Sequence, residues 1–287
     1  MHIAGFTFIR NGIKFDYPFL ESLRSLLPIC NEVIVAVGRS DDSTLEAVES
    51  LNSPKIIIVQ TSWDESAVSG GSILSQQTNI ALEHIQGDWG FYLQGDEVLH
   101  EKDYDAILKA MDRYKDDGRV EGLLFSYFHF YGSYEYIGNS RRWYRREIRA
   151  IKPALGIRSW GDAQGFRLAG RKLNVKLIDA SIYHYGWVKP PEVQQLKQQH
   201  FNKFWHSETW IEKHVGVKAE YDYRQGGKLQ FFKGTHPSAM SNRIKDQRWN
   251  LHYDPSNNRQ PFKEKILDSF EALCGRRIGE YKNYKLL

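Results

Sequence analysis

Short apolar runs alternate with amphipathic stretches along the first hundred residues. Leu20, Leu23 and Leu27 are spaced as on one face of a helix, and Ser43 and Glu46 can form a capping box at the start of the next helix, at Thr44. The segments predicted as strands are residues 2–9, 32–37, 55–60 and 89–93, and those predicted as helices are residues 17–27, a stretch from residue 44, and residues 72–85. Strands that alternate with helices of this length predict an α/β fold with a parallel sheet and helices on both faces.

The second half of the chain combines aromatic-rich strands with a polar, irregular tail. Pro190 and Pro191 can open a long helix that is predicted to reach His214. The other elements predicted in this half are strands at residues 120–131, 142–151 and 181–185 and a helix near residues 263–273. We therefore expect a core over residues 1–188 and, over residues 189–287, a helical and irregular extension packed on that core.

The composition narrows the class of protein. Of the 287 residues, 41% are hydrophobic, which is enough for a packed core. The two cysteines, Cys30 and Cys274, lie far apart, which argues against a disulfide framework and favours a reducing compartment. The N-terminus lacks the pattern of a signal peptide, and no apolar run approaches the roughly 18 residues of a membrane span. A cytoplasmic protein is therefore expected.

The charge balance bears on the partners. The net charge of +4 arises from 39 basic and 35 acidic residues. Such a mild excess suits an anionic ligand or a loose, peripheral association with the inner face of a membrane. A nucleic-acid-binding protein would carry a larger and more clustered positive charge, so we expect no nucleic-acid partner.

Polar residues follow the predicted strands at the points where the strands end. In an open α/β sheet, ligands bind at the carboxyl ends of the strands, which here are residues 10–11, 38–42, 61–64 and 94–97. Asp96 comes directly after an apolar strand, and Gly95 before it permits close approach of a backbone or a phosphate. Asp96 is therefore a candidate ligand of Mg²⁺ or Mn²⁺ together with diphosphate oxygens, the alternative being a helix cap or a solvated turn.

Four stretches of the sequence carry a resemblance to a known family. They are FTFIRNG (residues 6–12), SDDST (40–44), GDWGFYLQGDEVL (87–99) and IYHYG (182–186). In this order they resemble the family-two-type glycosyltransferases, over roughly residues 3–190. The resemblance implies a GT-A fold, in which a Rossmann-like mixed sheet is flanked by helices. It also implies an inverting transfer of a sugar from a nucleotide diphosphate sugar to a carbohydrate or glycolipid acceptor.

The resemblance further implies a set of metal and donor contacts. Asp96 and His184 would bind Mn²⁺ or Mg²⁺, the alternative for His184 being a structural residue packed among aromatic side chains. The donor contacts expected in the loops after the strands are Arg10, Asn11, Asp42, Asp64, Gln94 and Gly95. Two positions depart from the family pattern. Gln94 replaces the first aspartate of the Asp-x-Asp motif, and residues 37–39 lack the acidic residue that contacts the base, so Asp42 or backbone groups would take over that contact.

An inverting transferase also needs a base that takes the proton of the acceptor hydroxyl. In the family this base is an Asp or Glu that stands just before a helix. Asp162 in SWGDAQGFR matches it by its position and its flanking glycines, and its alternative role is a helix N-cap. Asp64 and Glu65 are weaker candidates for the same role.

The segment 190–214 carries many aromatic residues. Phe201 and Trp205, and likewise His206 and Trp210, are four residues apart and would share a helix face. We expect this segment to cover the acceptor side of the cleft, with packing of the aromatic face on the core as the alternative.

The sequence therefore predicts a glycosyltransferase, with the synthesis of bacterial surface polysaccharide or lipopolysaccharide as its setting. A nucleotidyltransferase would need a glycine-rich basic loop after the first strand, and RNGIKF contains one glycine. A non-catalytic carbohydrate- or nucleotide-sugar-binding protein is the remaining alternative, because eight Trp and sixteen Tyr allow stacking on sugar rings. That alternative leaves Asp96, Asp162 and His184 at strand ends unexplained.

Overall fold

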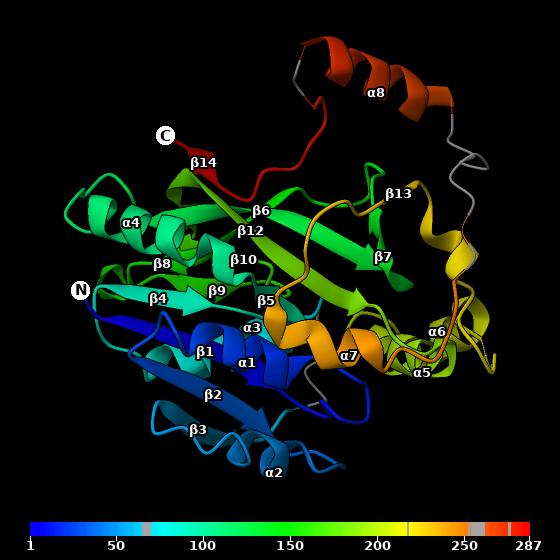
Figure 1. The fold of residues 1–287 in the computed structure, drawn as a ribbon, viewed down its shortest axis with the longest axis horizontal. Coiled ribbons are helices and arrows are strands. Elements are labelled where there is room, and N and C mark those ends of the chain that lie inside the picture. The colour runs from blue at the N-terminus through cyan, green and yellow to red at the C-terminus, as the bar shows by residue number, and fades with distance from the viewer. Residues whose placement is uncertain (65–69, 217, 252, 254–261, 275–276) are drawn as a thin grey trace.

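The computed structural model describes residues 1–64, 70–216, 218–251, 253, 262–274 and 277–287 (Figure 1). The strands are β1 (Ile3–Ile9), β2 (Glu32–Gly38), β3 (Ile56–Thr61), β4 (Trp89–Tyr92), β5 (Glu97–Leu99), β6 (Gly122–Tyr131), β7 (Ser133–Gly138), β8 (Arg146–Ile151), β9 (Arg158–Trp160), β10 (Gly165–Leu168), β11 (Arg171–Lys172), β12 (Asn174–Trp187), β13 (Leu229–Phe231) and β14 (Lys285–Leu286). The α-helices are α1 (Phe19–Leu26), α2 (Thr44–Glu49), α3 (Ser72–Glu83), α4 (Tyr104–Tyr114), α5 (Pro191–Phe201), α6 (Glu208–His214), α7 (Ser241–Lys245) and α8 (Phe262–Cys274). The 3-10 turns are η1 (Glu101–Asp103), η2 (Pro153–Leu155), η3 (Asn202–Phe204), η4 (Tyr223–Gly226) and η5 (Ser238–Met240).

The main sheet is mixed. In the described part of the chain it has 11 strands, and its principal order is β13–β7–β6–β8–β4–β1–β2–β3. The strands β4, β1, β2 and β3 pair in parallel, as the alternation of strands and helices predicts. Antiparallel pairing begins at β8, and the long strand β12 runs parallel to β6 and antiparallel to β5. The predicted class, a mixed α/β sheet flanked by helices, is confirmed.

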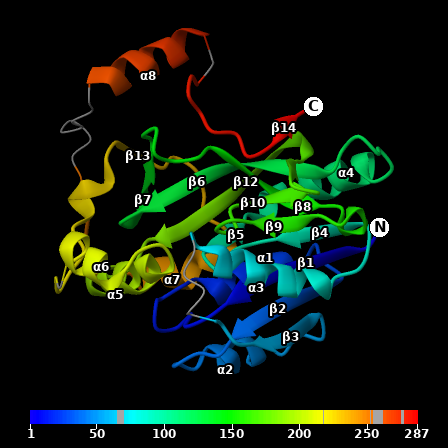
Figure 2. The same ribbon diagram turned by 180° about the vertical axis from the view of Figure 1, so that it is seen from behind.

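Two hydrophobic layers cover the two faces of this sheet. One contains Leu23 and Leu26 of α1 together with Ile107 and Met111 of α4. The other contains α3 and a second sheet of three strands, ordered β11–β10–β9, whose Phe166 is completely buried (Figure 2). Buried apolar side chains on both faces explain why the parallel strands read as continuous apolar runs.

Three local expectations were wrong in detail. The helix α2 does begin at Thr44, but no side-chain capping bond from Ser43 is formed; Asp42 instead accepts a hydrogen bond from the Thr44 amide at 3.0 Å. The strand expected over residues 142–151 begins only at Arg146, because the residues before it form a turn. The long helix expected up to His214 is divided, since Ser207 caps a new helix by accepting from the Trp210 amide.

The C-terminal segment returns to the main sheet. β13 pairs with β7, and β14 pairs with β12 near the end of the chain. Residues after 188 therefore add strands to the sheet as well as helices around it. The division of the chain at residue 188 stays a prediction. Within the described ranges, no helix combines the length and the apolar character needed to span a membrane.

Candidate active site

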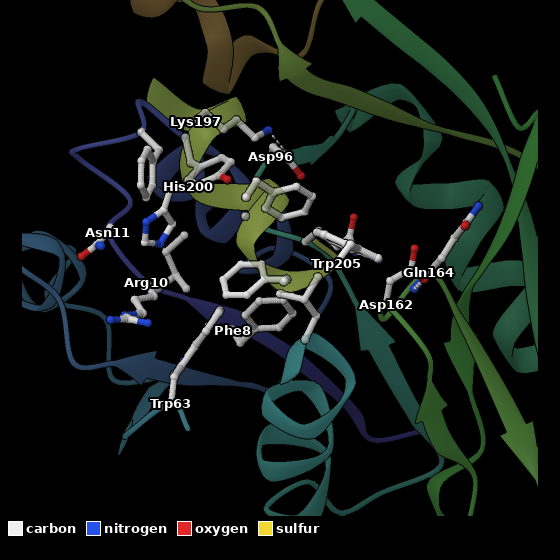
Figure 3. Close-up of a pocket in the computed structure, with 18 of the residues that line it drawn as sticks. Phe8, Arg10, Asn11, Trp63, Asp96, Asp162, Gln164, Lys197, His200 and Trp205 are labelled. Carbon is white, nitrogen blue, oxygen red and sulfur yellow. Dashed lines mark hydrogen bonds and ion pairs between the residues drawn. The ribbon is translucent and has the colours of Figure 1, made fainter. Parts of the chain in front are cut away.

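A pocket opens at the carboxyl ends of the parallel strands (Figure 3). The strand-end residues that line it are Arg10 and Asn11 after β1, Trp63 after β3, and Gln94, Gly95 and Asp96 after β4. Because these ends meet at one edge of the sheet, four of the six predicted donor contacts and the predicted metal ligand Asp96 come together. That they bind a donor stays a prediction.

The opposite wall of the pocket comes from α5 and η3. The lining residues are Lys197, His200 and Phe201 of α5, Phe204 of η3, and Trp205, which follows η3. The amide of Gly71, at the N-terminus of α3, donates to the Phe204 carbonyl at 3.0 Å, which ties this wall to the core. The predicted cover of the cleft by the segment 190–214 thus includes residues that face the pocket; whether they contact an acceptor is untested.

A buried ion pair shapes the loop that carries Asp96. Glu97 and Arg149 are fully buried and form two charge-assisted hydrogen bonds of 2.7 and 2.8 Å. Glu97 also accepts from the Gln94 amide at 3.1 Å and from the Tyr127 hydroxyl at 2.8 Å. Since all these bonds converge on Glu97, the turn after β4 is fixed, and Asp96 is directed toward β12.

Asp96 lies between an imidazole and an ammonium group. Its Oδ2 is 3.7 Å from His184 Nε2 and 3.6 Å from Lys197 Nζ. Burial alone would raise the pKa of Asp96, but His184, Lys197 and Lys189 together hold that pKa well below its usual range. Gly186 allows the close approach, because a Cβ there would overlap both Asp96 and His184. Asp96 is therefore an ionised carboxylate.

A second histidine sets the orientation of His184. His129 Nε2 lies 2.7 Å from the carbonyl oxygen of Tyr144, which can only accept, so this nitrogen carries a proton. Burial lowers the pKa of His129 well below its usual value, so the ring is neutral and its Nδ1 is an acceptor. His184 Nδ1, 3.1 Å away, is then the donor. The Nε2 atom of His184 consequently faces Asp96.

The pair formed by Asp96 and His184 fits a divalent metal ion. A carboxylate oxygen and an imidazole nitrogen face each other, and His129 supports the imidazole as outer partners of metal-binding histidines do. The approach of His184 Nε2 to Asp96 Oδ2 is favourable when Nε2 carries a proton, and it would also be favourable with a metal ion bound by both side chains. Among the described residues no group of three or more His, Cys, Asp and Glu side chains could hold a metal. Further ligands would have to come from the donor and from water.

The other end of the pocket contains hydrogen-bond donors that are not used within the described structure. Asn11 is completely buried; its Oδ1 accepts from the Asp41 amide at 2.8 Å, but its Nδ2 has no partner there. Trp63 Nε1 is likewise buried without a described partner. The Arg10 guanidinium lies over the Trp63 ring, 5.3 Å from its centroid. Buried donors without acceptors are costly, so this end is suited to a ligand that carries acceptor atoms.

Two predicted donor contacts lie outside this lining. Asp42 accepts hydrogen bonds from the backbone amides of Thr44 and Lys14, at 3.0 and 2.6 Å, and thereby shapes the loop before α2. Asp64 is exposed and is not part of the lining described. Glu65, the weaker candidate base, lies outside the described residues.

Asp162 lines the pocket at the end opposite to Arg10 and Trp63 (Figure 3). It does not precede a helix, as the family pattern suggested; it stands in the turn between β9 and β10, where its Oδ1 accepts from the Gln164 amide at 3.3 Å. The side chain is exposed, so an acceptor hydroxyl can approach it.

Sequence reasoning missed two charged residues: Lys197 in the lining of the pocket, and Glu147 behind the lining residue Gln164. Lys197 gave no signal, because one lysine in a polar helix is the normal pattern of a solvated face. Glu147 is almost completely buried on β8, and its Oε1 accepts from Gln164 Nε2 at 2.9 Å. Burial raises the pKa of Glu147 to about 8, with Arg149 and the Gln164 bond opposing the shift.

Comparisons with known proteins give matches among solved structures. No protein-family model and no curated protein matches the sequence. The chain is similar to S. aureus TarS 1-349, also solved with UDP-GlcNAc, at 15% identity, a TM-score of 0.41, and coverage of 76% of this chain and 71% of that chain in the complex. It is similar to 4-diphosphocytidyl-2C-methyl-D-erythritolsynthase from Anaerococcus prevotii at 10% identity and a TM-score of 0.36, over 54% and 71% of the two chains. Mannosyl-3-phosphoglycerate synthase from Rubrobacter xylanophilus matches at 15% identity and a TM-score of 0.31, over 45% and 41%.

Proposed function

We propose that this protein is a glycosyltransferase that moves a sugar from a nucleotide diphosphate sugar to a carbohydrate or glycolipid acceptor. The observation that carries the proposal is the division of the strand-end pocket into three parts. Unused donors of Asn11 and Trp63 lie at one end, the carboxylate of Asp96 lies between, and the exposed carboxylate of Asp162 lies at the other end. A nucleoside, a diphosphate and a reacting sugar have the same order along a donor molecule.

The donor is placed with its nucleoside at the end formed by Arg10, Asn11 and Trp63. Acceptor atoms of a base or ribose would satisfy the buried donors, and an aromatic ring together with a guanidinium offers a stacking surface. Gln94 and Gly95 border the path from this end toward Asp96. Asp42 and Asp64 are kept as outer contacts of the donor loops, on the resemblance alone.

Asp96 and His184 are the residues that would hold Mn²⁺ or Mg²⁺. When bound, such an ion neutralises negative charge on the leaving nucleoside diphosphate. The chain itself supplies an ionised carboxylate and an imidazole whose orientation His129 fixes. Gln94, in place of the first aspartate of the motif, offers an amide to the donor and adds no charge.

Asp162 is proposed as the general base of an inverting transfer. The acceptor hydroxyl attacks the anomeric carbon and loses its proton to the carboxylate, while the bond from that carbon to the diphosphate oxygen breaks. The exposure of Asp162 at the pocket mouth supports this role, since the acceptor must enter from solvent. The proposed setting is bacterial surface polysaccharide or lipopolysaccharide synthesis, in the cytoplasm or at the inner face of the membrane.

A turnover assay tests the proposed function. The purified protein is incubated with UDP-, GDP-, CDP- and ADP-linked sugars, with Mn²⁺ or with a chelator, and free nucleotide is measured with and without added oligosaccharides. Release of nucleoside diphosphate from one donor, stimulated by an acceptor, is the expected result. Binding of a nucleotide sugar without release of nucleotide under any condition would instead identify a non-catalytic binding protein.

A further inference from the structure

Lys197 is a buried lysine in the lining of the pocket, and its ammonium group lies beside Asp96. It projects from α5, and 7% of the residue is exposed. Its Nζ donates to the carbonyl oxygen of Gly186 at 2.9 Å and lies 3.6 Å from Asp96 Oδ2. A dashed line marks the ion pair with Asp96 in Figure 3. The ring of Tyr17 covers it at 4.7 Å. Lysine is seldom buried unless it is paired, and here the Asp96 carboxylate is the anion that pairs with it.

A second buried lysine, Lys189, lies near Asp96 and Lys197. Lys189 is also fully buried; its Nζ donates to the Asp16 carbonyl at 2.9 Å and lies 4.3 Å from the centroid of the Tyr17 ring. Burial, followed by the neighbouring charge of Lys197, lowers the pKa of Lys189 well below its usual value. The nearby carboxylate of Asp16 is paired with Arg243 at 2.8 Å, so the ion pair that remains at the pocket is that of Asp96 and Lys197. Of the two lysines, Lys197 is the one that lines the pocket.

The position of Lys197 also conflicts with metal binding in the donor-free protein. Its ammonium group contacts the same oxygen, Oδ2 of Asp96, that faces His184. A divalent ion between Asp96 and His184 would lie within a few ångströms of this ammonium, and like charges at such distances repel strongly in a buried site. A metal ion and Lys197 can share the site only if a further anion joins them.

We propose that Lys197 is a diphosphate ligand that exchanges partners. In the donor-free protein it pairs with Asp96. When the donor binds, its ammonium group transfers to the diphosphate, and Asp96 becomes available to the metal ion. The inference rests on the proposed function, because it needs a nucleoside diphosphate in the pocket. A side chain with four rotatable bonds can make this exchange without a change in the fold.

If Lys197 exchanges partners, Lys197→Met should strengthen Mn²⁺ binding and weaken nucleotide binding. Mn²⁺ binding to the donor-free protein, followed by electron paramagnetic resonance, should tighten by at least about tenfold, because a competing cation is removed. Affinity for the tightest-binding member of a set of UDP, GDP, CDP and ADP, measured by calorimetry in Mn²⁺, should fall by at least about tenfold, because a phosphate ligand is lost. The control is Lys203→Met, which removes an exposed lysine from η3 and should change neither affinity.

The outcomes separate this inference from the proposed function. The exchange is refuted if a nucleoside diphosphate binds Lys197→Met as tightly as it binds the wild-type protein. It is also refuted if the donor-free variant binds Mn²⁺ no more tightly than the wild-type protein. In both cases the proposed function stands. If none of the four binds the wild-type protein, both fail. Should Lys197→Met not fold, judged by its thermal transition, Lys197→Gln is used; it removes the charge and keeps a polar group, and the same two shifts are required of it.

Discussion

The carboxylate of Asp162 is the residue on which the proposed chemistry depends. It is exposed in the lining of the pocket, and it accepts a hydrogen bond from the Gln164 amide within its own turn. Asp162→Asn keeps the shape and the turn but cannot take a proton. We expect kcat to fall by at least about a hundredfold with little change in donor affinity, measured by steady-state kinetics and calorimetry. Weakened donor binding with unchanged turnover would show instead that Asp162 is a binding contact.

Glu147 should make stability depend on pH. Its pKa is raised by burial to about 8 in the folded protein, against a usual 4.5. The folded state therefore holds a proton that the unfolded state releases, so the free energy of unfolding should decrease as the pH rises from about 4.5 to 8, by up to about 1.4 kcal/mol per pH unit.

Glu147→Gln removes this proton and provides the comparison. Denaturant unfolding between pH 5 and 9 should give a stability difference between the two proteins that shifts in favour of the variant as the pH rises to 8 and then levels off. A difference that stays constant with pH would mean that the Glu147 carboxyl titrates normally. Its neighbours Arg149, Glu97 and Asp162 remain in both proteins, so their contributions largely cancel.

The buried pair of Glu97 and Arg149 is predicted to support the fold and the site together. Arg149→Met leaves the Glu97 carboxylate buried without its cation, which typically costs about 3–5 kcal/mol. Chemical denaturation measures this loss. Arg119→Met is a matched control, because its pair with Asp117 is exposed and should contribute about 0–1 kcal/mol. Equal effects of the two substitutions would contradict the structural role given to Arg149.

At the scale of elements, the segment after residue 188 is predicted to be indispensable. It supplies the pocket wall of α5 and η3, the edge strand β13 and the strand β14 beside β12. A chain that ends at Val188 would leave Phe8, Trp63 and Leu74 of the apolar pocket uncovered. We expect it to lack a cooperative thermal transition, measured by circular dichroism. A fragment that melts like the whole protein and still transfers sugar would show that the extension is an accessory.

Two kinds of element could be predicted from the sequence: strands in which every residue of an apolar run is buried, and helices that bury one face. β1, β2 and β4 read as apolar runs because both faces of the sheet are covered, and α1 shows its core-facing leucines at helical spacing. Strands such as β9 and β11 are two or three residues long, and so short a run has no recognisable period. The break after α5 was missed because the signal of the Ser207 cap was weaker than the apparent continuity of the helix.

The site could be predicted only where it lies at strand ends. Arg10, Asn11, Gln94, Gly95 and Asp96 follow apolar strands directly, and the parallel topology brings such positions to one edge. Lys197 reaches the same edge from α5, about a hundred residues later in the chain, and no local pattern marks that return. Glu147 likewise meets a residue distant from β8, because Gln164 in the turn between β9 and β10 donates to it.

At the scale of the whole molecule, the central claim is that the edge of the mixed sheet binds a nucleoside diphosphate at Asp96. Asp96→Asn keeps the volume of the side chain and removes its charge. Asp105→Asn provides the control, since Asp105 is exposed on α4 and pairs only with Lys109 among the described contacts. The fold of both variants can be checked by their thermal transitions before any binding is measured.

Calorimetric titration tests the claim most directly. UDP, GDP, CDP and ADP are each titrated into the wild-type protein and these two variants, once with Mn²⁺ and once with a chelator. The account predicts that one nucleotide binds the wild-type protein and Asp105→Asn in the presence of Mn²⁺, and that Asp96→Asn loses at least about tenfold in affinity. If no nucleotide binds the wild-type protein, or if Asp96→Asn binds the nucleotide as tightly as the wild-type protein does, the site assigned at this edge of the sheet is wrong.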